Sequence, residues 1–226
     1  MKHKRVTLFA GHYGSGKTNA AVNYAFALKN EGLEVTVADL DTVNPYFRTK
    51  DSEKDLAEAG IKLIASEFAN SNVDLPALPA EMYNVVFDKS RYAVLDIGGD
   101  DRGAFALGRY TPSILEENDY AALLVINKYR PLTATAEDCI EIMREIEASS
   151  GIPFTGIVNN SNLGSATTAE NVLDSVEYAN EVSRIAGIPV VFTCAKPEIC
   201  RELDGKIENL KPIRLYVRQS FDKKEE

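Results

Sequence analysis

Eight consecutive residues near the N-terminus combine three glycines with a lysine and a threonine at fixed spacing. They read Gly11-His12-Tyr13-Gly14-Ser15-Gly16-Lys17-Thr18, which matches the pattern G-x-x-x-x-G-K-[ST] at every fixed position. Glycines let such a loop curl so that its backbone N–H groups point inward, beside the positive end of the following helix. Lys17 would then neutralise the β- and γ-phosphates of a nucleoside triphosphate, and the Thr18 hydroxyl would bind Mg²⁺. The alternative is a glycine-rich turn that binds nothing.

Three aspartates stand where strand-like apolar runs end. Asp39 and Asp41 follow one run, and Asp96 follows another, just before Gly98-Gly99. Carboxylates at the carboxyl ends of parallel strands lie in the crevice where doubly wound sheets bind ligands. An aspartate that ends a strand is the usual partner of a phosphate loop, and we expect Asp96 to hold Mg²⁺ through water. An acidic turn at 39–41 and a glycine turn at 98–99 are the alternatives.

Two places in the sequence could read the base of the nucleotide. Asn127-Lys128 imitates the first half of the guanine-reading motif N-K-x-D, but its fourth position is Arg130. Guanine presents two donors that require a carboxylate, so this mismatch argues against GTP. The amide of Asn159 can match the N6/N7 edge of adenine. Ala195-Lys196-Pro197 follows the next strand and could give backbone contacts to the same ring. A simple turn is the alternative for Asn159-Asn160.

These residues must be positioned by alternating strands and helices. An apolar strand at Val6–Ala10 precedes the loop, and a helix over about 18–31 follows it. Further strands are expected at 34–38, 61–65, 92–95, 121–126, 155–158, 190–193 and 213–217, with helices at 51–60, 79–88, 111–118, 133–148 and 169–186. This alternation predicts a three-layer αβα fold with a mainly parallel, doubly wound sheet.

The expected organisation is one nucleotide-binding domain over residues 1–220, followed by a disordered tail at 221–226. The segment 66–79 breaks the pattern and is a candidate lid or partner surface. No run of 18 apolar residues exists, so no spanning helix is expected. A net charge of -9 argues against nucleic acid as the main partner.

The three cysteines, Cys139, Cys194 and Cys200, form no C-x-x-C pair. An odd number of cysteines without that spacing is typical of reduced thiols in a cytoplasmic protein, and it provides no closed metal site. The alternative is one cysteine contributed to a cluster that is shared across a dimer.

The phosphate loop, Asp39-Leu40-Asp41, Asp96-Ile97-Gly98-Gly99 and Val158-Asn159 together resemble the CobQ/CobB/MinD/ParA nucleotide-binding domain, along nearly the whole chain. Within that superfamily the chain is most similar to single-domain MinD/ParA-like P-loop ATPases. The resemblance implies a Mg-ATP site and a nucleotide-sandwich homodimer. In that site Asp39 and Asp96 support the water shell of the metal, and Asp41 orients the attacking water. Lys17, Thr18 and Asn159 hold the phosphates, the metal and adenine, respectively.

The sequence departs from this family at the loop. Members with the deviant loop read x-K-G-G-x-G-K-[ST], and their first lysine reaches the partner's nucleotide, whereas here that position is His12 and Tyr13 replaces a glycine. An imidazole carries charge only below about pH 6.5, so the permanent charge of lysine is missing. The chain also lacks the cationic C-terminal membrane helix of MinD, so no stable membrane anchor is expected, and it lacks the basic surface of a DNA-partitioning ParA.

The leading hypothesis is an ATP-dependent molecular switch, in which Mg-ATP orders the loops 41–48 and 97–103 for an unidentified protein client and slow hydrolysis releases them. The first alternative is an ATP-dependent small-molecule kinase or ligase of the dethiobiotin-synthetase type, with an acceptor pocket from residues 66–90, Arg102 or Arg109. The second is a metallocentre-insertion ATPase. Such proteins carry paired cysteines at the dimer interface, and none stands near these loops.

Overall fold

A computed structural model of the chain describes residues 3–40, 52–65, 81–98, 104 and 107–216. Eight strands form one sheet in the order β3-β2-β4-β1-β5-β6-β7-β8, and each pairing between neighbours is parallel. The strands are β1 (Val6–Ala10), β2 (Val35–Asp39), β3 (Lys62–Ala65), β4 (Tyr92–Asp96), β5 (Tyr120–Ile126), β6 (Gly156–Asn159), β7 (Val190–Ala195) and β8 (Leu210–Pro212).

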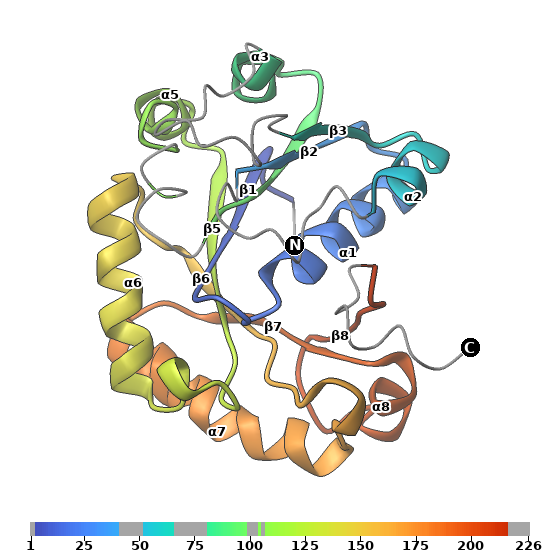
Figure 1. Cartoon of the computed structure of the whole chain (residues 1–226), viewed down its shortest axis with the longest axis vertical. Helices are drawn as coiled ribbons and strands as arrows, with labels where there is room; N and C mark the ends of the chain where they lie inside the picture. Colours follow the sequence, from blue (N-terminus) through green and yellow to red (C-terminus); the bar gives the residue numbers. More distant parts are fainter. Residues whose placement is uncertain (1–2, 41–51, 66–80, 99–103, 105–106, 217–226) are drawn as a thin grey trace, which may run out of the picture.

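Helices cover both faces of this sheet (Figure 1). They are α1 (Lys17–Asn30), α2 (Glu53–Glu58), α3 (Glu81–Phe87), α5 (Thr111–Glu117), α6 (Ala136–Ser150), α7 (Ala169–Ala186) and α8 (Pro197–Glu202), with short 3₁₀ turns η2 (Pro131–Thr133) and η3 (Gly164–Ala166). One apolar core packs α1 and α2 on the first face, and the other packs α3, α5, α6 and α7 on the second. The predicted three-layer αβα fold is therefore confirmed.

Alternating side chains divide the central strands between the two cores. In β1, Phe9 faces the α1 side, whereas Leu8 and Ala10 face the opposite side. Helix α1 is rich in alanine, which favours helix formation, and it buries Ala21, Ala25 and Leu28 at helical spacing against this side of the sheet. The first turn of α1 is thereby fixed beside the carboxyl ends of the central strands.

One helix starts clearly later than predicted. Helix α6 begins at Ala136, three residues after its expected start, because residues 131–133 form a 3₁₀ turn and Thr135 caps the helix in a capping box with Asp138.

The prediction of a last strand at 213–217 was wrong. The edge strand is β8. The N–H of Ile213 still donates to the carbonyl of Ala195 in β7, and the described chain beyond it turns to α1. There the side chain of Asn23 bonds the backbone of Arg214, and that of Asn19 accepts from the N–H of Tyr216 at 3.0 Å.

Several expectations lie outside the described residues: those for Asp41, for the irregular segment 66–79 and for the tail at 221–226. Within the described part of the chain, no helix combines the length and the apolar character needed to cross a bilayer.

Candidate functional site

The loop between β1 and α1 is shaped by close approaches that only glycine allows. A Cβ on Gly11 would lie 2.4 Å from the backbone oxygen of Val125 in β5, so β1 can end against its neighbour only without a side chain there. Gly16 has a left-handed backbone with φ of 84°, and its Cβ would lie 2.2 Å from Nδ2 of Asn160. The loop closes on itself through a bond of 3.1 Å from the N–H of Ser15 to the carbonyl of His12.

Helix α1 starts directly from this loop. Lys17 and Thr18, the residues predicted to hold phosphates and metal, are 4% and 5% exposed in its first turn. The hydroxyl oxygen of Ser15 is also buried, and among the described residues no hydrogen-bond partner is found for it. A buried hydroxyl beside the start of a helix is suited to an anionic ligand.

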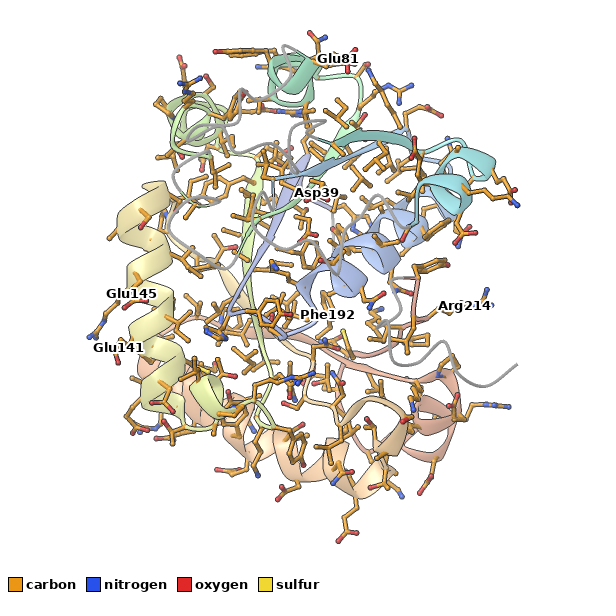
Figure 2. All side chains as sticks on the ribbon, viewed as in Figure 1. Asp39, Glu81, Glu141, Glu145, Phe192 and Arg214 are labelled. Atoms are coloured by element: carbon orange, nitrogen blue, oxygen red, sulfur yellow. The ribbon has the colours of Figure 1, made fainter. Side chains whose placement is uncertain are left out.

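Sheet register brings two of the predicted metal carboxylates together. Asp39 in β2 and Asp96 in β4 are register partners on neighbouring parallel strands. Val37 and Val94, two residues earlier on each strand, pack on the α1 side, so the alternation of strand side chains places both carboxylates on that side. Both are buried, and Figure 2 marks Asp39 at the end of its strand.

A threonine hydroxyl and carboxylates are the hard oxygen ligands that suit Mg²⁺. Across the described segments no group of three or more His, Cys, Asp or Glu side chains is placed to hold a metal ion. Thr18, Asp39 and Asp96 are the described groups that would hold Mg²⁺, directly or through water.

Two side chains that the sequence did not single out for this role reach the loop from neighbouring strands. Nε of Arg130, which follows β5, donates to the carbonyl of Gly14 at 3.0 Å. Nδ2 of Asn160, directly after β6, donates to the carbonyl of Ser15 at 2.7 Å. No spacing rule points to them, because their position depends on the order β1-β5-β6 in the sheet.

The structure uses the amide of Asn159 internally. The side chain is fully buried, and its Nδ2 donates to Oγ of Ser175 in α7 at 2.9 Å. Its Oδ1 accepts from the N–H and the hydroxyl of Ser161. With both ends of the amide engaged, a contact with adenine would need these bonds to rearrange, so the predicted role of Asn159 stays a prediction.

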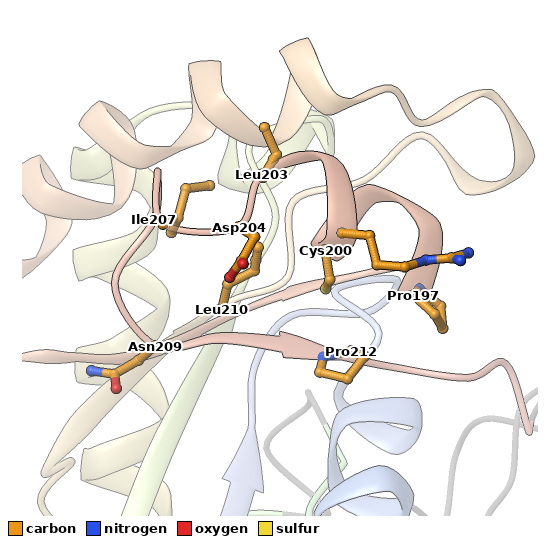
Figure 3. A pocket seen from close by; sticks show the side chains of 10 residues that line it. Pro197, Cys200, Leu203, Asp204, Ile207, Asn209, Leu210 and Pro212 are labelled. Atoms are coloured by element: carbon orange, nitrogen blue, oxygen red, sulfur yellow. The ribbon is translucent and has the colours of Figure 1, made fainter.

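Pro197 is exposed at the first turn of α8. It borders a cavity of about 630 Å³ between α8 and β8, which Figure 3 shows from close by. The lining residues are Pro197, Cys200, Arg201, Leu203, Asp204, Gly205, Ile207, Asn209, Leu210 and Pro212. None of them belongs to the phosphate loop, so the cavity and the loop site share no residue of that loop.

The Asn127-Lys128 pair anchors its own loop. Oδ1 of Asn127 accepts from the backbone N–H of Tyr129 and of Asn162. Lys128 forms an ion pair of 2.6 Å with Asp174 in α7, and its hydrogen bond and charge hold the pKa of that carboxyl below its usual value. The loop that carries Arg130 is therefore tied to α7 and to the loop after β6.

His12 and Tyr13 occupy the outer part of the loop. Nδ1 of His12 lies 3.0 Å from the carbonyl oxygen of Tyr13, and the Tyr13 side chain is 54% exposed. At these two variable positions of the motif, the Tyr13 side chain is exposed and His12 is partly buried, whereas Lys17 and Thr18 are buried.

The described thiols are poor candidates for a metal cluster. Burial raises the pKa of Cys139 to about 11, and its sulfur lies 2.8 Å from the hydroxyl of Tyr178. Burial also raises the pKa of Cys194 strongly, and Cys200 is half-buried with a raised pKa. Metal binding requires a thiolate, which these environments disfavour at neutral pH.

Comparison with known proteins gives a family match. A family model described as the CobQ/CobB/MinD/ParA nucleotide binding domain matches residues 6–186. None of the curated proteins compared with the chain matches it.

Solved structures with a similar fold include the cell division protein FtsY of Thermotoga maritima, with 18% identity and a TM-score of 0.56 over 93% of this chain and 65% of that one. The chloroplast FtsY of Physcomitrella patens has 19% identity and a TM-score of 0.56 over 85% of this chain and 59% of that one. Another is the signal recognition particle 54 kDa protein of Aeropyrum pernix in complex with GDP, with 19% identity and a TM-score of 0.53 over 85% of this chain and 41% of that one. The chain spans less than two thirds of the length of these structures, and at such identities the likeness shows the fold alone.

Proposed function

Because the chain belongs to the CobQ/CobB/MinD/ParA nucleotide-binding domain family, we propose that it binds Mg-ATP, hydrolyses it slowly and acts as a nucleotide-dependent molecular switch. The observation that carries this proposal is the placement of Lys17 and Thr18, buried in the first turn of α1, on the same side of the sheet as Asp39 and Asp96. A cation, a hydroxyl and two carboxylates on one side of the sheet are the groups that a metal-bound triphosphate needs.

Each residue has a distinct role in this proposal. The backbone N–H groups of the loop and the Lys17 ammonium bind the β- and γ-phosphates, because both present positive charge to them. Thr18, Asp39 and Asp96 would hold Mg²⁺ directly or through water, and the ion would neutralise charge on the phosphate oxygens. Asp41 orients the attacking water, which is a positioning role and not covalent chemistry.

We further propose a cytoplasmic protein that forms a homodimer when ATP binds and releases an unidentified client after hydrolysis. Buried, protonated thiols agree with a reducing compartment. The exposed outer part of the loop at Tyr13 is where a second subunit could approach the nucleotide. Sedimentation of the protein with ATP, with ADP and without nucleotide tests the dimer, which should form with ATP alone.

We expect ATP to compete more strongly than GTP for the site. Arg130 stands where a guanine-reading carboxylate would be needed, and its side chain lies on the loop backbone. The experiment displaces a fluorescent ATP analogue with increasing ATP or GTP in the presence of Mg²⁺. Equal or stronger displacement by GTP would assign the site to guanine. No binding of the analogue at all would remove the proposed function.

We expect His12→Lys to raise ATP turnover or to tighten the ATP-bound dimer. The substitution restores a permanent positive charge at the position from which, in family members with the lysine, the partner's nucleotide is contacted, and such a charge stabilises the developing negative charge in the transition state. Steady-state phosphate release and sedimentation measure both effects.

The matched control is His3→Lys. His3 is the other of the two histidines in the chain, and it contacts Glu31 and Tyr24, away from the loop. Turnover should not change in that variant. A His12→Lys protein that is kinetically silent and stays monomeric in all three nucleotide states would leave a site that acts within one subunit.

A further inference from the structure

Two neighbouring carbonyl groups of the phosphate loop are held from outside the loop. The carbonyl of Gly14 accepts from Nε of Arg130 at 3.0 Å, and the carbonyl of Ser15 accepts from Nδ2 of Asn160 at 2.7 Å. The donors come from two different loops, after β5 and after β6. Both strands lie on the same side of β1 in the sheet.

These bonds decide where the loop's N–H groups point. In a trans peptide the C=O and the following N–H lie on opposite sides of the chain. With the carbonyls of Gly14 and Ser15 turned outward, the N–H groups of Ser15 and Gly16 are turned inward. The inward N–H of Ser15 donates to the carbonyl of His12 at 3.1 Å, a bond that a bound phosphate would replace. Inward N–H groups in succession form the concave surface that binds a phosphate.

Both donors are themselves fixed by neighbouring structure. Asn160 is buried; its N–H donates to the carbonyl of Ile126, and its carbonyl accepts from Nδ2 of Asn162. The backbone of Arg130 donates to the carbonyl of Asn127 and accepts from the N–H of Thr133. Because the supports are rigid, they can hold the loop in shape without a ligand.

The contact at Gly14 also brings a positive charge to the loop. A Cβ on Gly14 would lie 3.3 Å from Nε of Arg130, so the guanidinium lies directly against this part of the backbone. No ion pair between Arg130 and an acidic side chain is seen among the described residues. A guanidinium that lies against the loop adds positive potential for anions there.

We infer that Arg130 and Asn160 are positioning residues that hold the phosphate loop in its binding shape before nucleotide arrives. This inference rests on the proposed function for its ligand, a nucleotide that carries a β-phosphate. The two side chains would keep the loop pre-formed, so that little of the free energy of nucleotide binding is lost in ordering the loop. Two other roles are distinguishable: a general contribution to folding, and direct contact of Arg130 with the γ-phosphate.

The first test follows the loop in the nucleotide-free protein. Hydrogen–deuterium exchange should become faster for a peptide that spans residues 12–16 in Arg130→Gln and in Asn160→Ala, while peptides from α6 and α7 should exchange as in the wild type. Arg144→Gln, which removes an exposed arginine from α6, is the matched control and should leave the loop unchanged. Unchanged loop exchange in both loop variants, or faster exchange throughout the protein, would overturn the inference.

The second test separates positioning from a direct γ-phosphate contact. Calorimetric titration of Arg130→Gln with ATP and with ADP should show the same loss of affinity for both, about tenfold, the size expected for one charge-assisted hydrogen bond. In Arg130→Lys, the logarithm of the affinity should regain less than half of what Arg130→Gln loses. Lysine restores the positive charge but not the planar guanidinium donor. A loss confined to ATP, or no loss, would contradict the inference. If the wild type binds neither nucleotide, the proposed function fails, and the exchange experiment still decides the role in loop shape.

Discussion

Replacing Lys17 with alanine should lower the affinity for Mg-ATP by at least about thirtyfold, since truncating one partner of a buried charge pair costs about 2–5 kcal/mol. Lys17 is 4% exposed at the start of α1, so its ammonium would meet the phosphates in a largely desolvated place. Calorimetric titration measures the effect. Lys17→Met keeps most of the apolar stem and should show the same loss, which separates the missing charge from missing packing.

The fold should survive both substitutions, because the packing of α1 depends on Ala21, Ala25 and Leu28 on its apolar side. The far-ultraviolet circular dichroism spectrum should therefore match that of the wild type. Lys206→Ala, at an exposed lysine beyond α8, is the control and should bind as the wild type does. An affinity for Mg-ATP unchanged in Lys17→Met would remove the assignment of this loop as the phosphate site.

The sequence predicts the parts of the site that depend on local pattern. The loop motif specifies which residues form the turn, and the strand–loop–helix order places Lys17 and Thr18 in the first helical turn. Apolar runs that end in aspartate predict Asp39 and Asp96 at the carboxyl ends of their strands. Parallel pairing of these strands then makes the two residues register partners. The loop and the strand ends follow from residues close together in the chain, whereas the pairing of Asp39 with Asp96 also needs β2 and β4 to be neighbours in the sheet.

The supports of the loop depend on strand order, which a single sequence does not contain. Arg130 is 116 positions from Gly14, and Asn160 is 145 positions from Ser15, so no spacing rule connects them. Adjacent asparagines illustrate the same limit. Asn159 turns toward Ser175 in α7 and Asn160 toward the loop, because successive strand side chains point to opposite faces. The sequence shows that two asparagines stand at the end of β6. Only the folded structure shows that Asn160, and not Asn159, bonds the phosphate loop.

The end of the sheet shows a different limit. The segment 213–217 has the composition of a strand, yet its described residues, 213–216, lie outside the strands of the sheet. Side-chain bonds from Asn19 and Asn23 take the backbone groups of Arg214 and Tyr216, and the Tyr216 ring stacks on Phe26 at a centroid distance of 4.5 Å. Tertiary contacts with α1 therefore replace the strand pairing that local pattern favours.

Substituting Gly16 with alanine should destabilise the nucleotide-free protein by about 1–3 kcal/mol and reduce nucleotide affinity at the same time. Two costs combine at this position. The backbone has φ of 84°, a conformation that residues with a Cβ rarely adopt, and the new Cβ would lie 2.2 Å from Nδ2 of Asn160. Relief of that contact would displace the amide that holds the carbonyl of Ser15. Denaturant unfolding measures the stability, and Gly108→Ala is the control, since its nearest neighbour would lie 3.9 Å away.

A double-mutant cycle separates the two costs. In an Asn160→Ala background the colliding amide is gone while the backbone strain at residue 16 stays, so Gly16→Ala should cost about 1 kcal/mol less there than in the wild type. Nucleotide affinity should not recover in the double variant, because the carbonyl of Ser15 has lost its donor. An equal cost in both backgrounds would mean that backbone strain alone requires glycine. The contact with Asn160 would then have no part in the choice of residue at this position.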